Sequence, residues 1–441
     1  MFIQCRTIHG SGFIMADGDN HYAGSSGTPG GGGRIAVHFD TAAQSNATPK
    51  AALTFSASGG FRPSGPHAGQ GTIYLSDSTI LAERMQGGQY LIPGFTSWQP
   101  GDLWIQGYGV VTLPPGFLLA VSNNLCITNY GGLFLTNTAS LIVGSNLTVD
   151  SCGLINLWLD GGTPAMMSVG GNLVVTNRTL SGPVTLNIYS GQTNAAAPDY
   201  GVLVNVAGDI VIATNTYLKP WSHPTNGGSP KFTCRTLCVN RGGVFDANYT
   251  GFAGGLATNP AEPADGWGPG RGRGSVYGGG GYGGKGGYAS GEYGQTYGSS
   301  NAPVHPGSGG GGGTGGGMRG GGLIRVEATR IKIYGTLTAS DPAWSGHTVG
   351  SASGGGIYLR CRYLEGDGSL NANGGHHYTG SSGAAGGGGR IAVWSVYDQF
   401  DFSTNRVTAA RGDSPEPARW GEPGTIVWGR LQLPGTVIQL R

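Results

Sequence analysis

The side chains best suited to metal chemistry in this sequence are those of Asp17-Gly18-Asp19-Asn20 and the CxxxC pair Cys234 and Cys238. Carboxylate and amide oxygens are typical ligands of Ca²⁺, and thiolates are typical ligands of Zn²⁺. A second copy of the first region reads Asn373-Gly374-Gly375-His376 and keeps neither aspartate. The cysteine pair has no second pair and no histidines at zinc spacing, so we predict no metal and no cofactor.

Sugar-cleaving chemistry would need clustered carboxylates. Acidic residues are sparse in the middle of the chain, and no two fall at matching positions of neighbouring repeats. They are Asp150, Asp160, Asp199, Asp209 and Asp246. The sequence therefore favours a protein without catalytic residues. A polysaccharide lyase or glycoside hydrolase stays open as the alternative.

Two histidine–tyrosine pairs recur at equivalent places, His21-Tyr22 and His377-Tyr378. One interpretation is a repeated ligand contact on one face of the fold. The other is a side chain that packs over a glycine segment and bonds to a backbone carbonyl, and duplication alone explains the recurrence. We name all four residues as candidate ligand contacts.

The element that must position these residues is a duplicated unit. Residues 1–37 align without a gap to residues 357–393, and 20 of the 37 positions are identical. The block Gly30 to Val37 matches Gly386 to Val393, and Cys5-Arg6 matches Cys361-Arg362. Cys234-Arg235 repeats the cysteine–arginine pair a third time.

The middle of the chain has a regular polar-apolar-x-apolar repeat. Leu125, Leu147 and Leu173 hold the same place in it, 22 and 26 residues apart, and each follows an asparagine. Such periods, with β-branched residues alternating, predict the stacked coils of a parallel β-helix. We expect the leucines to stack inside it, and Asn124, Asn146 and Asn172 to form an amide ladder.

Glycine is the commonest residue, 89 of 441, and it falls in runs between the predicted strands. Runs of this kind occur in flexible linkers. Here they begin and end on strands of the same core, which favours ordered, polyproline-II-like segments packed too closely for any side chain. Residues 251–322 form the longest such excursion.

The strings Gly30-Gly31-Gly32-Gly33-Arg34-Ile35-Ala36-Val37 and Gly71-Thr72-Ile73-Tyr74-Leu75 resemble the glycine-rich β-solenoid regions of large extracellular bacterial proteins. The glycine runs are similar to the polyglycine-II sandwiches of phage-fibre adhesins and of a glycine-rich antifreeze protein. The resemblance covers about residues 1–90 and 230–430 at the level of pattern. It implies an extracellular or cell-surface structural or adhesive role, and it carries no catalytic residues.

The composition limits the kinds of binding partner that we expect. The net charge is +2 and only 11% of residues are charged, so we predict no nucleic-acid binding. No stretch approaches 18 uninterrupted apolar residues, so we predict no membrane span. We divide the chain into N-terminal solenoid coils (1–95), regular β-helix coils (96–250), the glycine- and tyrosine-rich excursion (251–322) and C-terminal coils that duplicate the first unit (323–441).

Both ends of the sequence carry strand-like residues without polar caps. Either the chain is a fragment of a longer repeat protein, or copies of it stack head to tail, and our hypothesis is the subunit of a filament or surface fibre. Phe2, Ile3, Ile438 and Leu440 are the candidate assembly contacts. The alternative is a glycan-binding adhesin, or a polysaccharide-degrading enzyme, on the same scaffold.

Overall fold

The regular secondary structure of the chain is almost all β, and its strands pair in parallel round an axis, as expected for a parallel β-solenoid. The computed structural model describes residues 1–20, 27–61, 68–91, 95–135, 138–151, 154–159, 165–179, 182–193, 199–257, 264–288, 292–313, 316–342, 344–345, 349–378, 383–403 and 406–432. It divides into two compact units. Unit 1 comprises Met1–Tyr189 with Ala213–Leu218, and unit 2 comprises Ser190–Ile212 with Lys219–Arg441.

The described part of unit 1 holds mostly short strands, the 11-residue strand β8, one short α-helix and a 3₁₀ turn. These elements are β1 (Phe2–Cys5), β2 (Ser11–Met15), β3 (Arg34–Phe39), α1 (Thr41–Ser45), β4 (Ala52–Ser56), β5 (Thr72–Leu75), η1 (Ser78–Ile80), β6 (Arg84–Leu91), β7 (Ser97–Trp98), β8 (Leu103–Leu113), β9 (Leu118–Val121), β10 (Leu125–Ile127), β11 (Gly132–Leu135), β12 (Ser140–Val143), β13 (Leu147–Asp150), β14 (Leu154–Leu159), β15 (Ala165–Val169), β16 (Leu173–Thr176) and β17 (Val184–Ser190).

The predicted ladders of unit 1 are confirmed. Leu125 pairs with Leu147 and Leu147 with Leu173, and all three side chains are fully buried. Asn124 Oδ1 accepts a hydrogen bond from the Asn146 N–H, and Asn146 Oδ1 accepts one from the Asn172 N–H. Each asparagine therefore satisfies the backbone of the next coil.

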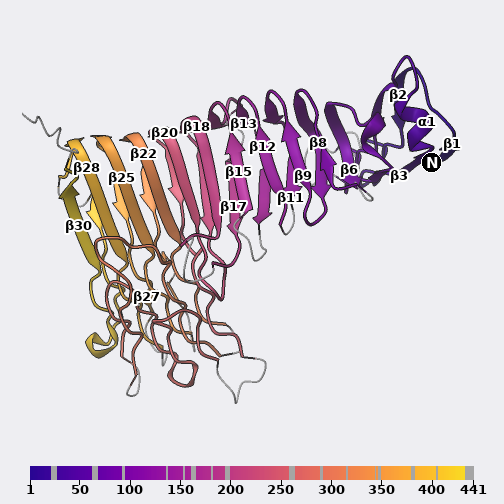
Figure 1. Cartoon of the computed structure of the whole chain (residues 1–441). Helices are drawn as coiled ribbons and strands as arrows, with labels where there is room; N and C mark the ends of the chain where they lie inside the picture. Colours follow the sequence, from indigo (N-terminus) through magenta and orange to yellow (C-terminus); the bar gives the residue numbers. More distant parts are fainter. Residues whose placement is uncertain are drawn as a thin grey trace, which may run out of the picture. The chain divides into compact units, whose positions relative to one another are not determined.

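Unit 2 holds the long strands (Figure 1). Its elements are β18 (Val202–Ile212), β20 (Pro230–Val239), β21 (Gly243–Asp246), η2 (Gly274–Val276), β22 (Leu323–Ile333), β23 (Thr336–Thr338), β24 (Trp344–Ser345), β25 (Gly356–Gly366), β26 (Ser369–Asn371), β27 (His376–His377), β28 (Arg390–Phe400), β29 (Val407–Thr408), η3 (Pro417–Arg419) and β30 (Thr425–Arg430); β19 (Thr216–Trp221) contributes residues to both units. Ile210, Leu237, Ile331 and Leu364 stack in its core.

The sequence duplication is also a structural one. Phe2 of β1 pairs with Ala36 of β3, and Tyr358 of β25 pairs with Ala392 of β28. Each pair occupies the same places of the two aligned copies. The two copies therefore share one strand register.

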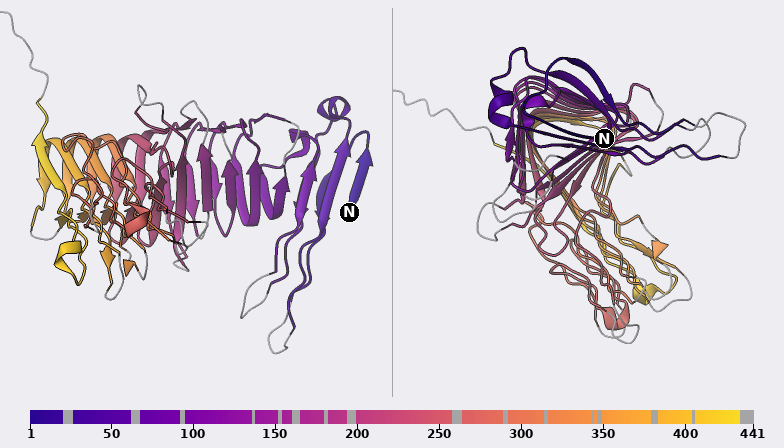
Figure 2. Two further views of the ribbon diagram at one scale, coloured as in Figure 1. Left: turned by 90° about the horizontal axis from the view of Figure 1, so that it is seen from below. Right: turned by 90° about the vertical axis from the view of Figure 1, so that its right-hand side faces the viewer.

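The glycine segments of unit 2 leave the ends of the long strands and run together in what we call the glycine bundle (Figure 2). It comprises the described residues of 251–322, 349–356, 372–389 and 409–424. In a β-strand, hydrogen bonds alternate between two neighbours, whereas here four consecutive residues bond to four different segments. Gly278 and Gly279 accept from the N–H groups of Gly311 and Gly294, and Gly280 and Gly281 donate to the carbonyls of Ser351 and Gly270.

Close approach explains why these positions are glycine. A Cβ atom on Gly387 would lie 2.2 Å from the carbonyl oxygen of Gly284 and 2.6 Å from that of Lys285. Backbone atoms cannot swing aside as a flexible side chain can. The described part of the longest excursion is thus ordered, and its order depends on the missing side chains.

Candidate functional site

Five long strands of unit 2 interrupt their pairing at the same place. The unpaired positions are Ala207–Gly208, Arg235, Thr329, Arg362 and Val396. In β18 the interruption is a register shift between Val206 and Asp209. Such irregularities bend a strand and re-aim its side chains. The strands lie side by side (Figure 1), so the bends form a line across them.

A groove of about 860 Å³ follows this line. Its volume lies in the range of small-ligand sites. Most of its lining consists of three consecutive residues from each strand, ending at the interruption: Asn205–Ala207, Thr233–Arg235, Glu327–Thr329 and Arg360–Arg362. The middle residue of each triplet is small, namely Val206, Cys234, Ala328 or Cys361. Val206 and Cys361 are buried, so the exposed residues on either side of them border the open side of the groove.

Within the part of the chain that the structure describes, some of the charged residues along the groove form ion pairs, and others do not. Arg235 forms two hydrogen bonds to the Asp209 carboxylate, at 2.9 and 3.0 Å, and these lower the pKa of Asp209. Glu327 lies 3.1 Å from the Lys231 ammonium. Among the ion pairs of the described residues, none involves Arg360 or Arg362.

A stack of aromatic and cationic side chains begins one residue beyond the groove. The rings of Tyr363 and Tyr397 are stacked at 5.1 Å with 15° between their planes. The Arg330 guanidinium lies 4.7 Å from the Tyr363 ring centroid. Tyr397 is 46% exposed and lines a smaller hollow together with Glu365. We call Arg330, Tyr363 and Tyr397 the tyrosine stack.

Two thiols line the groove, those of Cys234 and Cys361. Burial raises the pKa of each to about 12, with nearby Asp209 adding to the effect at Cys234 and Asp398 at Cys361. Neither forms a disulfide, and Cys238 is also free. Both thiols therefore stay protonated at neutral pH.

We expect iodoacetamide at pH 8 to alkylate Cys234 and Cys361 about a thousandfold more slowly in the folded chain than in the denatured chain, because the thiolate is the reactive species. The rate should rise tenfold for each pH unit, since the pKa lies far above 8. Mass spectrometry of time-resolved digests measures this, with the urea-denatured chain as reference. Equal rates in folded and denatured protein would contradict the burial of these thiols.

Two of the four residues predicted as ligand contacts, His377 and Tyr378, are described, and neither lines the groove. His377 is buried on β27, and a Cβ on Gly383 would lie 2.6 Å from its ring, so it packs against a glycine segment. Tyr378 is exposed. His21 and Tyr22 lie outside the described residues. A ligand-contact role for these pairs stays a prediction.

The predicted assembly contacts are described in part. Phe2 is 67% exposed on β1, and its ring lies 5.3 Å from that of His38. Ile3 is half-buried on the same strand. Ile438 and Leu440 lie outside the described residues.

The aspartate cluster near residue 17 serves the backbone. Asp17 Oδ1 accepts hydrogen bonds from the Ser56 hydroxyl at 2.6 Å and the Ser58 N–H at 2.7 Å. Asn20 Oδ1 accepts one from the Phe61 N–H. Within the described ranges, no group of three or more His, Cys, Asp or Glu side chains is arranged to hold a metal ion.

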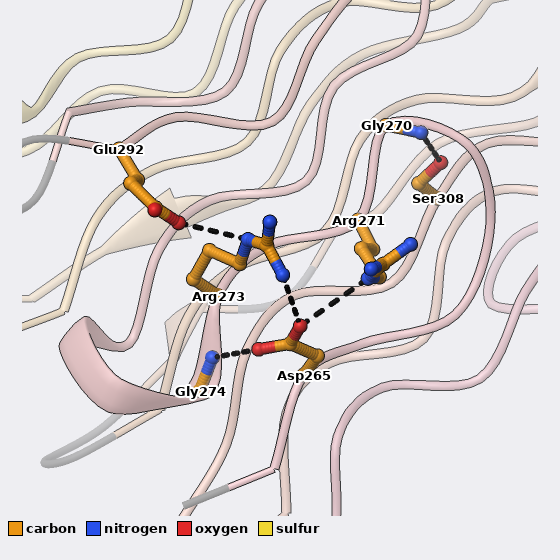
Figure 3. Close-up of polar contacts among 7 residues, drawn as sticks. All are labelled: Asp265, Gly270, Arg271, Arg273, Gly274, Glu292 and Ser308. Atoms are coloured by element: carbon orange, nitrogen blue, oxygen red, sulfur yellow. Dashed lines mark hydrogen bonds and ion pairs between the residues drawn. The ribbon is translucent and has the colours of Figure 1, made fainter.

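A second polar cluster lies in the glycine bundle (Figure 3). Asp265 accepts hydrogen bonds from Arg273 at 2.7 Å, Arg271 at 3.3 Å and the Gly274 N–H at 2.9 Å, and Arg273 also lies 2.8 Å from Glu292. Burial opposes ionisation of Asp265, but these bonds hold its pKa below the usual value. Because both arginines are already paired with carboxylates, the cluster links bundle segments, and the groove is the stronger candidate.

Comparisons with protein-family models, curated proteins and solved structures find no match to this chain. In the described residues, no helix is long and apolar enough to cross a membrane.

The sequence did not indicate the groove, although it contained one signal for it. Cys234-Arg235 and Cys361-Arg362 hold equivalent places, because Cys234 pairs with Ala328 and Ala328 with Cys361. The repeated cysteine–arginine pair thus marks the bend in two of the strands. The bend itself depends on the pairing of neighbouring coils, which no single strand sequence reveals.

Proposed function

We propose that the protein is an extracellular structural β-solenoid that binds glycans in the groove of unit 2. The observation that carries this proposal is the groove itself, which crosses several strands beside the tyrosine stack. With neighbouring strands about 4.8 Å apart, a line across five strands is roughly 19 Å long. That length suits an extended polymer. The extracellular location comes from the sequence resemblance.

The chemistry of the lining supports a sugar ligand. Asn205, Thr233 and Thr329 line the groove with amide and hydroxyl groups. The Thr233 hydroxyl donates to Asn205 Oδ1 at 2.8 Å, which leaves the Asn205 amide N–H groups as donors and the Thr233 oxygen as an acceptor for sugar hydroxyls. Tyr397 presents an exposed aromatic ring on β28, one residue beyond the groove position Val396, and flat apolar faces suit contact with sugar rings.

The lining supports binding without cleavage. Glu327 is the one carboxylate among the described residues of the groove, and it is paired with Lys231. Hydrolysis of a glycosidic bond ordinarily uses two carboxylates that flank the bond. An adhesin or a matrix component is therefore the form of glycan binding that we propose.

Affinity electrophoresis through gels that contain dissolved polysaccharides tests the proposal. We expect at least one polymer to retard the full chain, and Tyr397→Ala to weaken the interaction about five- to tenfold through loss of the stacking face. Tyr130→Ala is the matched control, because Tyr130 is 44% exposed and stacked on Tyr108 in unit 1. Equal weakening in both variants, or no retardation by any polymer, would reject the groove as a glycan site.

Head-to-tail assembly is a second proposed property of the same scaffold. Two features of β1 favour it. Phe2 is exposed, and among the described strands β1 pairs with β3 alone. A strand with one open edge can pair with another chain. A filament would present many grooves along its length, so the two properties are compatible.

A further inference from the structure

We infer that the groove selects acidic glycans, with Arg360 and Arg362 holding a carboxylate group of the polymer. This inference rests on the proposed glycan binding and adds to it the class of sugar. Both arginines line the groove, and both are exposed on β25.

The two guanidinium groups belong to one site because of strand geometry. Arg360 and Arg362 are two residues apart on β25, about 7 Å at the backbone, and both are exposed. Between them lies Cys361, which is buried and small. Two long side chains thus border one section of the groove, with open space above the residue that separates them.

Arg360 and Arg362 are the charged groove residues whose charge is not neutralised by an ion pair among the described residues. Arg235 is neutralised by Asp209, and Glu327 by Lys231. The Arg362 guanidinium lies over the Tyr363 ring, 5.3 Å from its centroid. A ring contact of this kind does not use the N–H donors at the edge of the guanidinium, so they stay open to a ligand. In the described part of the chain, no carboxylate forms an ion pair with Arg360 or Arg362. The groove therefore has an excess of positive charge.

A carboxylate fits this excess better than a neutral sugar does. Guanidinium groups bind carboxylates through paired, charge-assisted hydrogen bonds. A neutral polymer would displace water from the two arginines without replacing those bonds, and a site built for a polar group discriminates strongly against a ligand that lacks it.

A nucleic acid is the other polyanion to consider, and the charge of the groove favours the glycan. A phosphate backbone is bound by many cations along its length. The groove offers two unpaired arginines, and the whole chain has a net charge of +2. Its remaining lining is made of amide, hydroxyl and small apolar groups, which suit sugar rings between widely spaced charges.

The test compares polygalacturonate, alginate and hyaluronate with their methyl esters, in which each carboxylate is neutral. Titration calorimetry with the full chain should show at least tenfold tighter binding of one or more acidic polymers than of its ester. The variant Arg360→Gln/Arg362→Gln should lose at least tenfold in affinity for that acidic polymer and keep its affinity for the ester.

The duplicated unit provides the controls. The residue aligned with Arg360 is Gln4, so Arg360→Gln introduces the residue that the first copy already has at this place. The residue aligned with Arg362 is Arg6. Arg6→Gln, in unit 1, should bind as the parent chain does. Circular dichroism and the melting temperature should be unchanged in the double variant.

The outcomes separate the inference from the function on which it rests. If an acidic polymer and its ester bind equally, and the double variant binds both as the parent does, the acid selectivity is wrong and the glycan groove stands. If none of the six polymers binds, both are wrong. If a single-stranded oligonucleotide binds more tightly than the polyuronates and loses affinity in the double variant, the site is one for nucleic acid.

Discussion

Gly387→Ala should destabilise the glycine bundle by about 3 kcal/mol, at the upper end of the cost of overpacking. The added methyl would lie 2.2 Å from the Gly284 carbonyl oxygen, so one of two backbone segments must move. Gly387 donates to the Gly280 carbonyl and accepts from the Gly354 N–H. Movement of either segment therefore strains or breaks these bonds.

Hydrogen exchange of residues 280–288 and 383–389, read by mass spectrometry, measures this effect locally. A local probe is needed because the chain has two compact units, and a single melting transition need not report on one of them. We expect the amides of both segments to lose protection, while those of β10 and β13 in unit 1 keep theirs.

The duplicated unit again provides the matched control. Gly31 aligns with Gly387, but the nearest atom to a Cβ there is the Gly69 carbonyl oxygen at 3.9 Å, an ordinary contact. Gly31→Ala should be neutral, or stabilising by about 0.4–1 kcal/mol, because alanine restricts the unfolded chain. The same substitution is thus expected to destabilise at position 387 and not at position 31. Equal effects at both sites would show that close packing does not explain the glycine at 387.

The sequence revealed those parts of the fold in which each coil repeats its neighbour. Leu125, Leu147 and Leu173 recur at one place of a repeat, and stacking them requires only that coils pair in register. The same holds for the asparagine ladder and for the duplicated register of β1–β3 and β25–β28. Periodic burial leaves a periodic pattern, and such a pattern is readable in one sequence.

The groove could not be predicted in that way. Its walls arise from an interruption in strand pairing, and in β18 the interruption needs an extra residue relative to β20. Arg360 and Arg362 are ordinary exposed strand residues by their pattern, and their role depends on which neighbours carry carboxylates. His377, by contrast, was singled out because it recurs, and it is buried against a glycine segment. A residue that recurs in the two copies therefore marks a shared structural position. The candidate binding residues become apparent only when the neighbouring strands are assembled.

Arg390→Ala should cost unit 2 about 2–3 kcal/mol, because a hydrogen bond from a charged group contributes about 1.5–3 kcal/mol and the Tyr297 carbonyl loses this donor. Arg390 is 7% exposed. Its guanidinium donates to the Tyr297 carbonyl at 3.0 Å, the Thr425 hydroxyl at 3.0 Å and the Tyr282 carbonyl at 3.3 Å, and it lies 5.4 Å from the Tyr282 ring centroid. One side chain thus joins the start of β28 to the excursion and to β30, and its loss leaves two buried carbonyls without this donor.

Arg390→Lys keeps the charge but lacks the planar group that reaches several partners, so we expect it to recover only part of the loss. Arg34→Ala is the control, because Arg34 is the aligned arginine of the first copy and is exposed on β3. Exposed substitutions of this kind stay within about 0.5 kcal/mol. Urea unfolding followed by hydrogen exchange of residues 278–288 and 292–297 measures all three variants. A loss at Arg390→Ala no larger than that at Arg34→Ala would mean that the excursion holds to the long strands through its backbone alone.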